Sequence, residues 1–341
     1  MKHLFFVLIF IFTAIICGCK KSEPLEHDNI KLLTQTILGS IRYKNEVFTN
    51  AEIKVTKDIT YRNLNDFAPG DQKKQALKLD FYEPINDLIK LRPLLIFIHG
   101  GGLKGGSKDD LINIELCKYY TRHGFAVASL NYRLDSALNR TMPSQRHAEA
   151  LYRGTQDARF AVRFMKANSS LTKIDATKIF IGGVSAGALI ALHATYINDS
   201  EVNRSLVNVS NLGPLNYGVK FTTSSSVRGA FAYAGALVDT NYIQRGDVPA
   251  ACIHSTGDNL IPIDYGLDGF LKLPMFGGKS IATRLYHLGV SGISFKQYND
   301  PLPIQPVPPS PMIQTHGAGL ENSANFAANN QFICDFIYSL L

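Results

Sequence analysis

Residues 178–189, Lys-Ile-Phe-Ile-Gly-Gly-Val-Ser-Ala-Gly-Ala-Leu, constrain the fold of this chain more than any other stretch. A short apolar run ends in Gly-x-Ser-x-Gly, and a helix-forming run over 188–196 follows at once. This order predicts a strand that turns sharply into a helix with Ser185 at the apex. Gly183 and Gly187 supply the small residues that such a turn needs, because its backbone and side chains come close together. Ser185 is therefore a candidate nucleophile, beside the positive end of the following helix.

A second serine, Ser291, has a similar local sequence but lies in a different context. Ser291 lies in Gly-Val-Ser-Gly-Ile at 289–293, which lacks the second glycine and precedes an apolar strand-like run instead of following one. We interpret that segment as a loop.

The first residues of the chain predict an export signal. Met1, Lys2 and His3 form a short basic start, and 4–16 is almost wholly apolar. An apolar run of about 13 residues is too short to span a bilayer comfortably and is typical of a signal-peptide core. The sequence 16–19, Ile-Cys-Gly-Cys, resembles a bacterial lipobox, so we expect 1–19 to be a signal peptide and Cys19 to carry a lipid. Residues 20–50 are then a polar tether and N-terminal segment.

These features predict a protein of the bacterial cell envelope that is held at a membrane through a lipid on Cys19. The alternative is an ordinary cleaved signal peptide without lipid, which gives a secreted or periplasmic protein. An uncleaved membrane anchor is the least favoured interpretation.

Composition limits the fold and the kinds of partner that the chain can have. The chain has 341 residues, of which 45% are hydrophobic, so 51–341 can form one large α/β domain. The formal net charge is +7, but the basic residues are scattered, which argues against a nucleic-acid partner. Of the cysteines, Cys252 lies in an apolar run and is expected in the core. Cys117 and Cys334 could form a disulfide, although two buried thiols are the favoured interpretation.

Strand-like and helix-like patterns alternate along 51–341. Strands are expected at 51–62, 77–82, 93–98, 125–130, 178–184, 227–234, 249–254 and 293–298, and helices at 109–122, 149–168, 188–196 and 320–341. The segment 198–226 has no clear period and is a candidate cap insertion. This alternation predicts an α/β fold with one mostly parallel sheet and helices on both faces.

A glycine turn follows a core strand at His99-Gly100-Gly101-Gly102. Backbone N–H groups at such a turn can point at a developing oxyanion without side chains in the way. A plain glycine turn is the less favoured alternative.

A carboxylate and a histidine complete the candidate set. Asp258 lies in the loop after the strand 249–254, and His316 lies in the glycine-rich loop that follows the last strand. The chain order is then serine, aspartate, histidine. Asp239 and Asp264 compete with Asp258, and we expect Asp264 to begin a helix, where a carboxylate caps well.

Together these stretches resemble an α/β-hydrolase of the esterase/lipase (carboxylesterase) group. The resemblance rests on 99–102, on Asn-Tyr-Arg-Leu at 131–134, on Gln-Asp-Ala-Arg at 156–159, on 183–187 and on the loop at Asp258. It implies a catalytic triad of Ser185, Asp258 and His316, and an oxyanion hole formed by the N–H groups of Gly101, Gly102 and Ala186.

The resemblance also implies a serine hydrolase that cleaves small or medium carboxylic esters through an acyl-enzyme, with acyl groups on carbohydrate or lipid among the candidate substrates. An exported serine peptidase and a non-catalytic binding protein of the same fold remain the alternatives. We expect no metal and no cofactor. The phosphate-loop-like run at 276–280 is rejected because Leu273 stands where the first glycine should be.

Overall fold

The computed structural model describes residues 41–89, 91–219, 221–298 and 323–341. The predicted signal peptide, Cys19 and His316 therefore lie outside the described residues. Within the described part, no helix is both long and apolar enough to cross a membrane.

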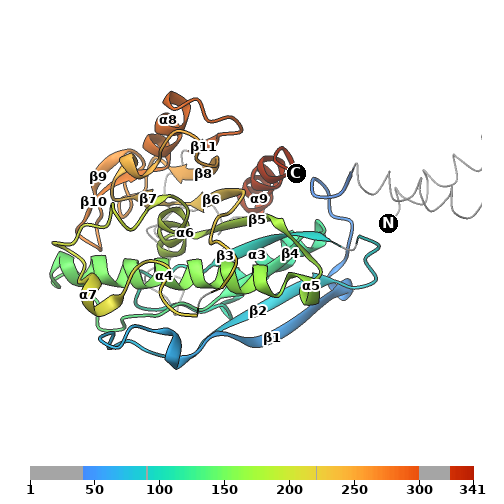
Figure 1. Cartoon of the computed structure of the whole chain (residues 1–341). Coiled ribbons are helices and arrows are strands. Elements are labelled where there is room, and N and C mark those ends of the chain that lie inside the picture. Colours follow the sequence, from blue (N-terminus) through green and yellow to red (C-terminus); the bar gives the residue numbers. More distant parts are fainter. Residues whose placement is uncertain (1–40, 90, 220, 299–322) are drawn as a thin grey trace, which may run out of the picture. The chain divides into compact units, whose positions relative to one another are not determined.

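The core of residues 42–341 is a mostly parallel sheet (Figure 1). Its strand order among the described residues is β1-β2-β4-β3-β5-β6-β8-β11. Strands β1 and β2 pair antiparallel with each other, β2 pairs antiparallel with β4, and the rest of the sheet is parallel. The strands are β1 (Ile53–Arg62), β2 (Leu77–Pro84), β3 (Arg92–Ile98), β4 (Ala126–Leu130), β5 (Ile174–Val184), β6 (Gly229–Tyr233), β8 (Ala250–Ser255) and β11 (Ser294–Tyr298).

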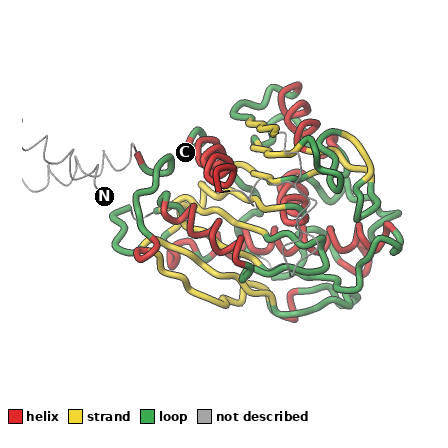
Figure 2. The backbone as a smooth tube through the Cα atoms, turned by 180° about the vertical axis from the view of Figure 1, so that it is seen from behind, coloured by secondary structure: helices red, strands yellow, loops and turns green. Residues whose placement is uncertain are grey.

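Helices cover both faces of this sheet, as Figure 1 and the reverse view in Figure 2 show. The α-helices are α3 (Leu111–Arg122), α4 (Ser144–Ala167), α5 (Ser169–Thr172), α6 (Ala186–Tyr196), α7 (Val209–Leu212), α8 (Gly278–His287) and α9 (Ser323–Tyr338). Short 3-10 helices lie at η1 (Asn50–Glu52), η2 (Leu64–Asp66) and η3 (Thr240–Tyr242).

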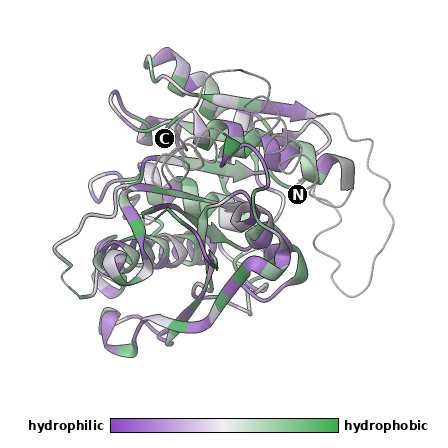
Figure 3. Cartoon of the chain, turned by 90° about the vertical axis from the view of Figure 1, so that its right-hand side faces the viewer, coloured by the Kyte–Doolittle hydropathy of each residue, from purple (hydrophilic) through white to green (hydrophobic). Residues whose placement is uncertain are grey.

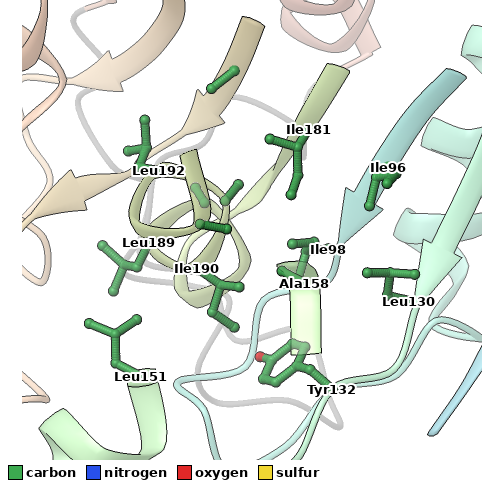
Figure 4. Close-up of a cluster of buried hydrophobic side chains, with 14 of the residues drawn as sticks. Ile96, Ile98, Leu130, Tyr132, Leu151, Ala158, Ile181, Leu189, Ile190 and Leu192 are labelled. Carbon is green, nitrogen blue, oxygen red and sulfur yellow. The ribbon is translucent and has the colours of Figure 1, made fainter. Parts of the chain in front are cut away.

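The sequence of β3 explains the two-sided burial. Every residue of this strand is buried, because alternate side chains point to opposite faces and both faces are covered. Leu94, Ile96 and Ile98 pack with α4 and α6, whereas Leu95 and Phe97 pack with α3 and α9. Figure 3 shows the hydrophobic colour gathered on the central strands, and Figure 4 shows side chains of α6 meeting those of β3 and β5.

The predicted fold class is confirmed, and most predicted elements are present with boundaries shifted by a few residues. Helix α4 begins at Ser144, before the expected start at Glu149. Its first turn is polar, so apolar periodicity does not reveal it, and an ion pair between Arg146 and Asp135 (2.7 Å) holds it against the preceding loop.

A second, three-stranded sheet was not predicted. It has the order β7-β10-β9 and comprises β7 (Ala236–Leu237), β9 (Tyr265–Leu267) and β10 (Pro274–Gly277). Strands this short show no alternation in sequence. Helix α8, which follows β10 directly, was not predicted either.

The candidate cap insertion at 198–226 lies along α4. The Gln156 amide donates to the carbonyls of Leu212 (2.9 Å) and Pro214 (2.9 Å), and the Lys166 ammonium donates to the Ser226 carbonyl (2.6 Å). These bonds hold the middle and the last residue of the insertion against one helix.

The described cysteines are free and buried, as favoured from the sequence. Cys117 and Cys334 pack on the same side of the sheet, and burial raises the pKa of the Cys117 thiol to about 12. Cys252 is a core residue of β8.

Candidate active site

Ser185 occupies a strained turn between β5 and α6. Its backbone has φ 54° and ψ −123°, which a residue with a Cβ seldom adopts. The Ser185 N–H donates to the Tyr233 carbonyl of β6 (2.8 Å), and the Ser185 carbonyl accepts from the Leu189 N–H (3.0 Å). The turn is thus held from the neighbouring strand and from the helix that it begins. Backbone strain of this kind clusters at functional sites.

The two flanking glycines are required by a close approach to β3. A Cβ at Gly183 would lie 2.2 Å from the Ile98 carbonyl oxygen, and a Cβ at Gly187 would lie 2.1 Å from the same atom. Both distances are far inside van der Waals contact. No other residue fits at either position without displacing the backbone.

The glycine turn after β3 lies beside Ser185. A Cβ at Gly100 would be 3.4 Å from the Ser185 Cβ and 3.1 Å from the Val184 carbonyl oxygen. The following residues Gly101, Gly102 and Leu103 have φ of 116°, 63° and 62°. This left-handed path turns the backbone sharply at the end of the strand.

The His99 ring fixes the first peptide plane of that turn. Its Nδ1 lies 2.7 Å from the Gly100 carbonyl oxygen, so Nδ1 carries the proton and donates. In a trans peptide the C=O and the next N–H point in opposite directions, so the Gly101 N–H faces away from the ring. Burial lowers the pKa of His99 to about 4, although the bond to Gly100 opposes that shift, and the ring stays neutral at pH 7. It stacks on Tyr132 with ring centroids 4.4 Å apart.

The segment 131–135 ties the glycine turn to α4. The Tyr132 hydroxyl donates to the His99 carbonyl (3.3 Å), and the Asp135 N–H donates to the Leu103 carbonyl (2.9 Å). Between them, Arg133 is buried and donates to Asp157 of α4 (2.9 Å) and to Asp71.

Asp157 also accepts from Arg62 (2.5 Å), so one buried carboxylate holds two guanidinium groups. In the sequence, Arg133 and Asp157 stand out only as parts of the resemblance, and their ion pair was not predicted. Asp157 stands between Gln156 and Ala158, with Arg159 next, so the local sequence does not show that it is buried.

Asp258 lies in the tight loop after β8, at the same carboxyl edge of the sheet as Ser185. Strand β6 separates β8 from β5. Oδ1 of Asp258 accepts from the N–H groups of Leu260 (2.9 Å) and Ile261 (2.9 Å), and the Asp258 side chain has no exposed surface. A buried carboxylate held by two backbone donors is rigidly oriented.

The two competing carboxylates have other roles. Asp239 accepts from the Asn241 N–H (2.8 Å) and caps η3. Asp264 does not begin a helix, contrary to expectation. It precedes the short strand β9, and its half-exposed side chain pairs with Lys279 (2.9 Å) and Ser280 at the start of α8.

Of the two remaining predicted site residues, the structure describes Ala186 but not His316. Ala186 is the first residue of α6, and the N–H groups of a first helical turn lack intrahelical acceptors. The Ser185 N–H is already bonded to Tyr233, which makes the Ala186 N–H the first available donor after the serine. The structure therefore brings Ser185, Ala186 and the glycine turn together, and places Asp258 in a loop at the same edge. His316 is not among the described residues.

Two other segments named in the sequence analysis lie among the described residues. Ser291 is an exposed residue between Gly289 and Gly292, in the loop before β11. The run 276–280 forms the junction of β10 and α8. Across the described part of the chain, no group of three His, Cys, Asp or Glu side chains could hold a metal ion.

Comparison with known proteins gives matches to esterases. The BD-FAE family model matches residues 79–226. The chain is 32% identical over 146 residues to 3-O-acetylpapaveroxine carboxylesterase CXE2 of Papaver somniferum, covering 39% of this chain and 44% of the relative. It is 31% identical over 145 residues to CXE1 of the same plant, covering 39% and 43%. The chain thus matches less than half the length of these curated relatives.

Solved structures resemble the chain over most of its length. The propionate-bound esterase 2 of Thermogutta terrifontis superposes with a TM-score of 0.57 at 18% identity, covering 86% of this chain and 95% of that chain. The form of the same esterase phosphorylated by paraoxon gives 0.56 at 17% identity, covering 84% and 93%. Identities this low establish the fold alone. The strand order, the strained turn at Ser185 and these likenesses show that this chain has the α/β-hydrolase fold.

Proposed function

We propose that the protein is a serine hydrolase that cleaves carboxylic esters of small molecules through an acyl-enzyme. The observation that carries the proposal is the strained Ser185 turn, with Gly100 packed against it. The match to BD-FAE over residues 79–226, which contain this turn, and the likeness to two plant carboxylesterases support an ester substrate.

In the proposed mechanism, His316 takes the proton of the Ser185 hydroxyl as that oxygen attacks the ester carbonyl. Asp258 holds the tautomer of His316 and stabilises the imidazolium. The N–H groups of Gly101, Gly102 and Ala186 receive the developing oxyanion, and removing one such donor typically costs ~3 kcal/mol of transition-state stabilisation. The same histidine then activates the water that releases the acid.

The neutral His99 ring supports this assignment of the oxyanion donors. Its bond to the Gly100 carbonyl fixes the direction of the Gly101 N–H before substrate arrives. Donors that are already oriented need no reorganisation during the reaction, which is the main source of their catalytic effect.

A substrate panel tests the proposal. Purified protein and its Ser185→Ala variant are assayed on p-nitrophenyl esters of increasing acyl length, on acetylated sugars and on peptide amides. We expect hydrolysis of short and medium esters that Ser185→Ala abolishes. Preferential cleavage of the amides would instead favour a serine peptidase, and an inert wild-type protein would favour a binding role.

We further propose that the mature protein begins at Cys19, carries lipid there and is held at a membrane of the bacterial cell envelope. The apolar run at 4–16 and the lipobox-like 16–19 support this. Mass spectrometry of the mature N-terminus from an expressing bacterium should find a lipid-modified Cys19, and Cys19→Ala should leave an unlipidated chain. An unmodified N-terminus at Cys19 or later in the wild type would leave only the plain signal peptide.

A further inference from the structure

We infer that His254, which ends β8 four residues before Asp258, is a positioning residue that holds the proposed catalytic acid. This rests on the proposed function, because it presumes that Asp258 acts in the reaction. The proposed catalytic residues do not include His254, whose ring is fully buried.

The hydrogen bonds of the ring fix its tautomer. The Gly278 N–H points at Nδ1 (3.4 Å), so Nδ1 is the acceptor. Nε2 lies 3.1 Å from the Ile261 carbonyl oxygen, so Nε2 carries the proton. The same Nε2 lies 3.5 Å from Oδ2 of Asp258. The N–H therefore donates to the Ile261 carbonyl, and the carboxylate of Asp258 lies beside it.

These contacts close a ring around the carboxylate. The Ile261 N–H donates to Oδ1 of Asp258 while the Ile261 carbonyl accepts from His254. Oδ1 is therefore held by backbone donors, and Oδ2 lies 3.5 Å from Nε2 of the imidazole. The imidazole ring thus anchors Ile261, whose N–H holds Oδ1, and its edge lies against Oδ2, so it limits how far the carboxylate can turn.

Other buried histidines of the described chain are held differently. The Nδ1 atoms of His193 and His123 contact carbonyls one turn earlier on their own helices, at Leu189 (2.7 Å) and Tyr119 (2.9 Å). His254 instead joins three separate segments, namely β8, the 258–261 loop and the start of α8. Gly278 makes this possible, since a Cβ there would lie 2.9 Å from the Cys252 Cβ and 3.4 Å from Nδ1 of His254.

Two variants of similar size separate the donor from mere packing. His254→Gln keeps an N–H donor, whereas His254→Met fills the same space without one. We expect His254→Met to lower kcat on the best ester by about tenfold or more with KM changed less than threefold, and His254→Gln to stay within about threefold of wild type. The side chain of His254→Asn is one carbon shorter than that of His254→Gln, so its amide cannot reach the same acceptor and the variant should resemble His254→Met. It replaces His254→Met in the comparison if the methionine variant does not fold. His123→Met is the matched control and should leave kcat unchanged.

A double-mutant cycle with Asp258→Asn tests whether the effect passes through the acid. In the Asp258→Asn background, His254→Met should lower kcat by less than about twofold, because there is no carboxylate left to hold. An equal loss in both backgrounds would overturn the inference and assign His254 to the fold. If Asp258→Asn alone leaves kcat within tenfold of wild type, Asp258 is not the catalytic acid and the positioning role falls with it. The proposed function fails separately, if Ser185→Ala keeps the ester hydrolysis of the wild type.

Discussion

Individual side chains at the carboxyl edge of the sheet are held by bonds that leave little freedom. Ser185 is fixed from β6, and Asp258 by two backbone donors of its own loop. Asp239 and Asp264 are already engaged as a cap and in a half-exposed ion pair. A carboxylate that is buried and held is better suited to orient a histidine than one that is exposed.

The three carboxylates can therefore be ranked by substitution. Asp258→Asn should lower kcat by ~10²–10⁴, in line with loss of the correct histidine tautomer. Asp239→Asn and Asp264→Asn should each cost less than about tenfold, under ~1.4 kcal/mol. Steady-state kinetics on one ester decides the ranking. A crippling Asp239→Asn with a mild Asp258→Asn would move the acid to the loop after β6.

The junction between β5 and α6 depends on its contact with the end of β3. The Ile98 carbonyl oxygen lies so close to Gly183 and Gly187 that it would clash with a Cβ atom at either position. The helix can start where it does only because both positions lack a Cβ. The serine geometry is therefore a product of three segments rather than of the motif alone.

Gly187→Ala should displace this junction. A Cβ 2.1 Å from the Ile98 oxygen must push β3 and α6 apart, at a cost of about 1–3 kcal/mol in the free energy of unfolding, as for other overpacked sites. Because Ser185 moves with the helix, ester hydrolysis should fall at least a hundredfold. Gly105→Ala is the control, since nothing lies within 4 Å of a Cβ there. Urea unfolding and kinetics measure both quantities, and wild-type behaviour of Gly187→Ala would contradict the packing argument.

The sequence predicts those elements whose period or motif is local. The buried run of β3 and the Gly-x-Ser-x-Gly turn are of this kind, and both are in place. The sheet of β7, β10 and β9 could not be predicted, because each strand is shorter than one clear alternation. The buried contacts of Asp157 with Arg62 and Arg133 join residues far apart in the chain. Asp264 was misassigned because Pro262 before it suggested a helix start, whereas β9 follows.

Across residues 42–341, buried histidines make the stability of the fold depend on pH. Burial lowers the pKa of both His99 and His193 to about 4, from an ordinary value of 6.5. The pKa values of His123 and His147 are also lowered by burial. Each ring is neutral in the folded protein over a range where the unfolded chain binds a proton.

The free energy of unfolding should therefore be fully maintained above pH 6.5 and fall as the pH drops from 6.5 toward 4. In that window the unfolded state holds more protons than the folded state. His99 and His193 each contribute a slope of about 1.4 kcal/mol per pH unit. Urea unfolding at pH 7, 6 and 5 measures the slope, and His193→Gln, which removes one of these groups, should make it shallower. A free energy of unfolding that does not change between pH 7 and 5 would contradict the buried neutral assignment.

The central claim is that Ser185 is the nucleophile of a serine hydrolase, and active-site labelling tests it most directly. Wild-type protein is treated with a fluorophosphonate and digested, and the modified peptide is identified by mass spectrometry. We expect one phosphonyl adduct on Ser185, lost in Ser185→Ala and retained in the matched control Ser291→Ala, with both variants folded. An adduct on another residue, or labelling that persists in Ser185→Ala, would contradict the account.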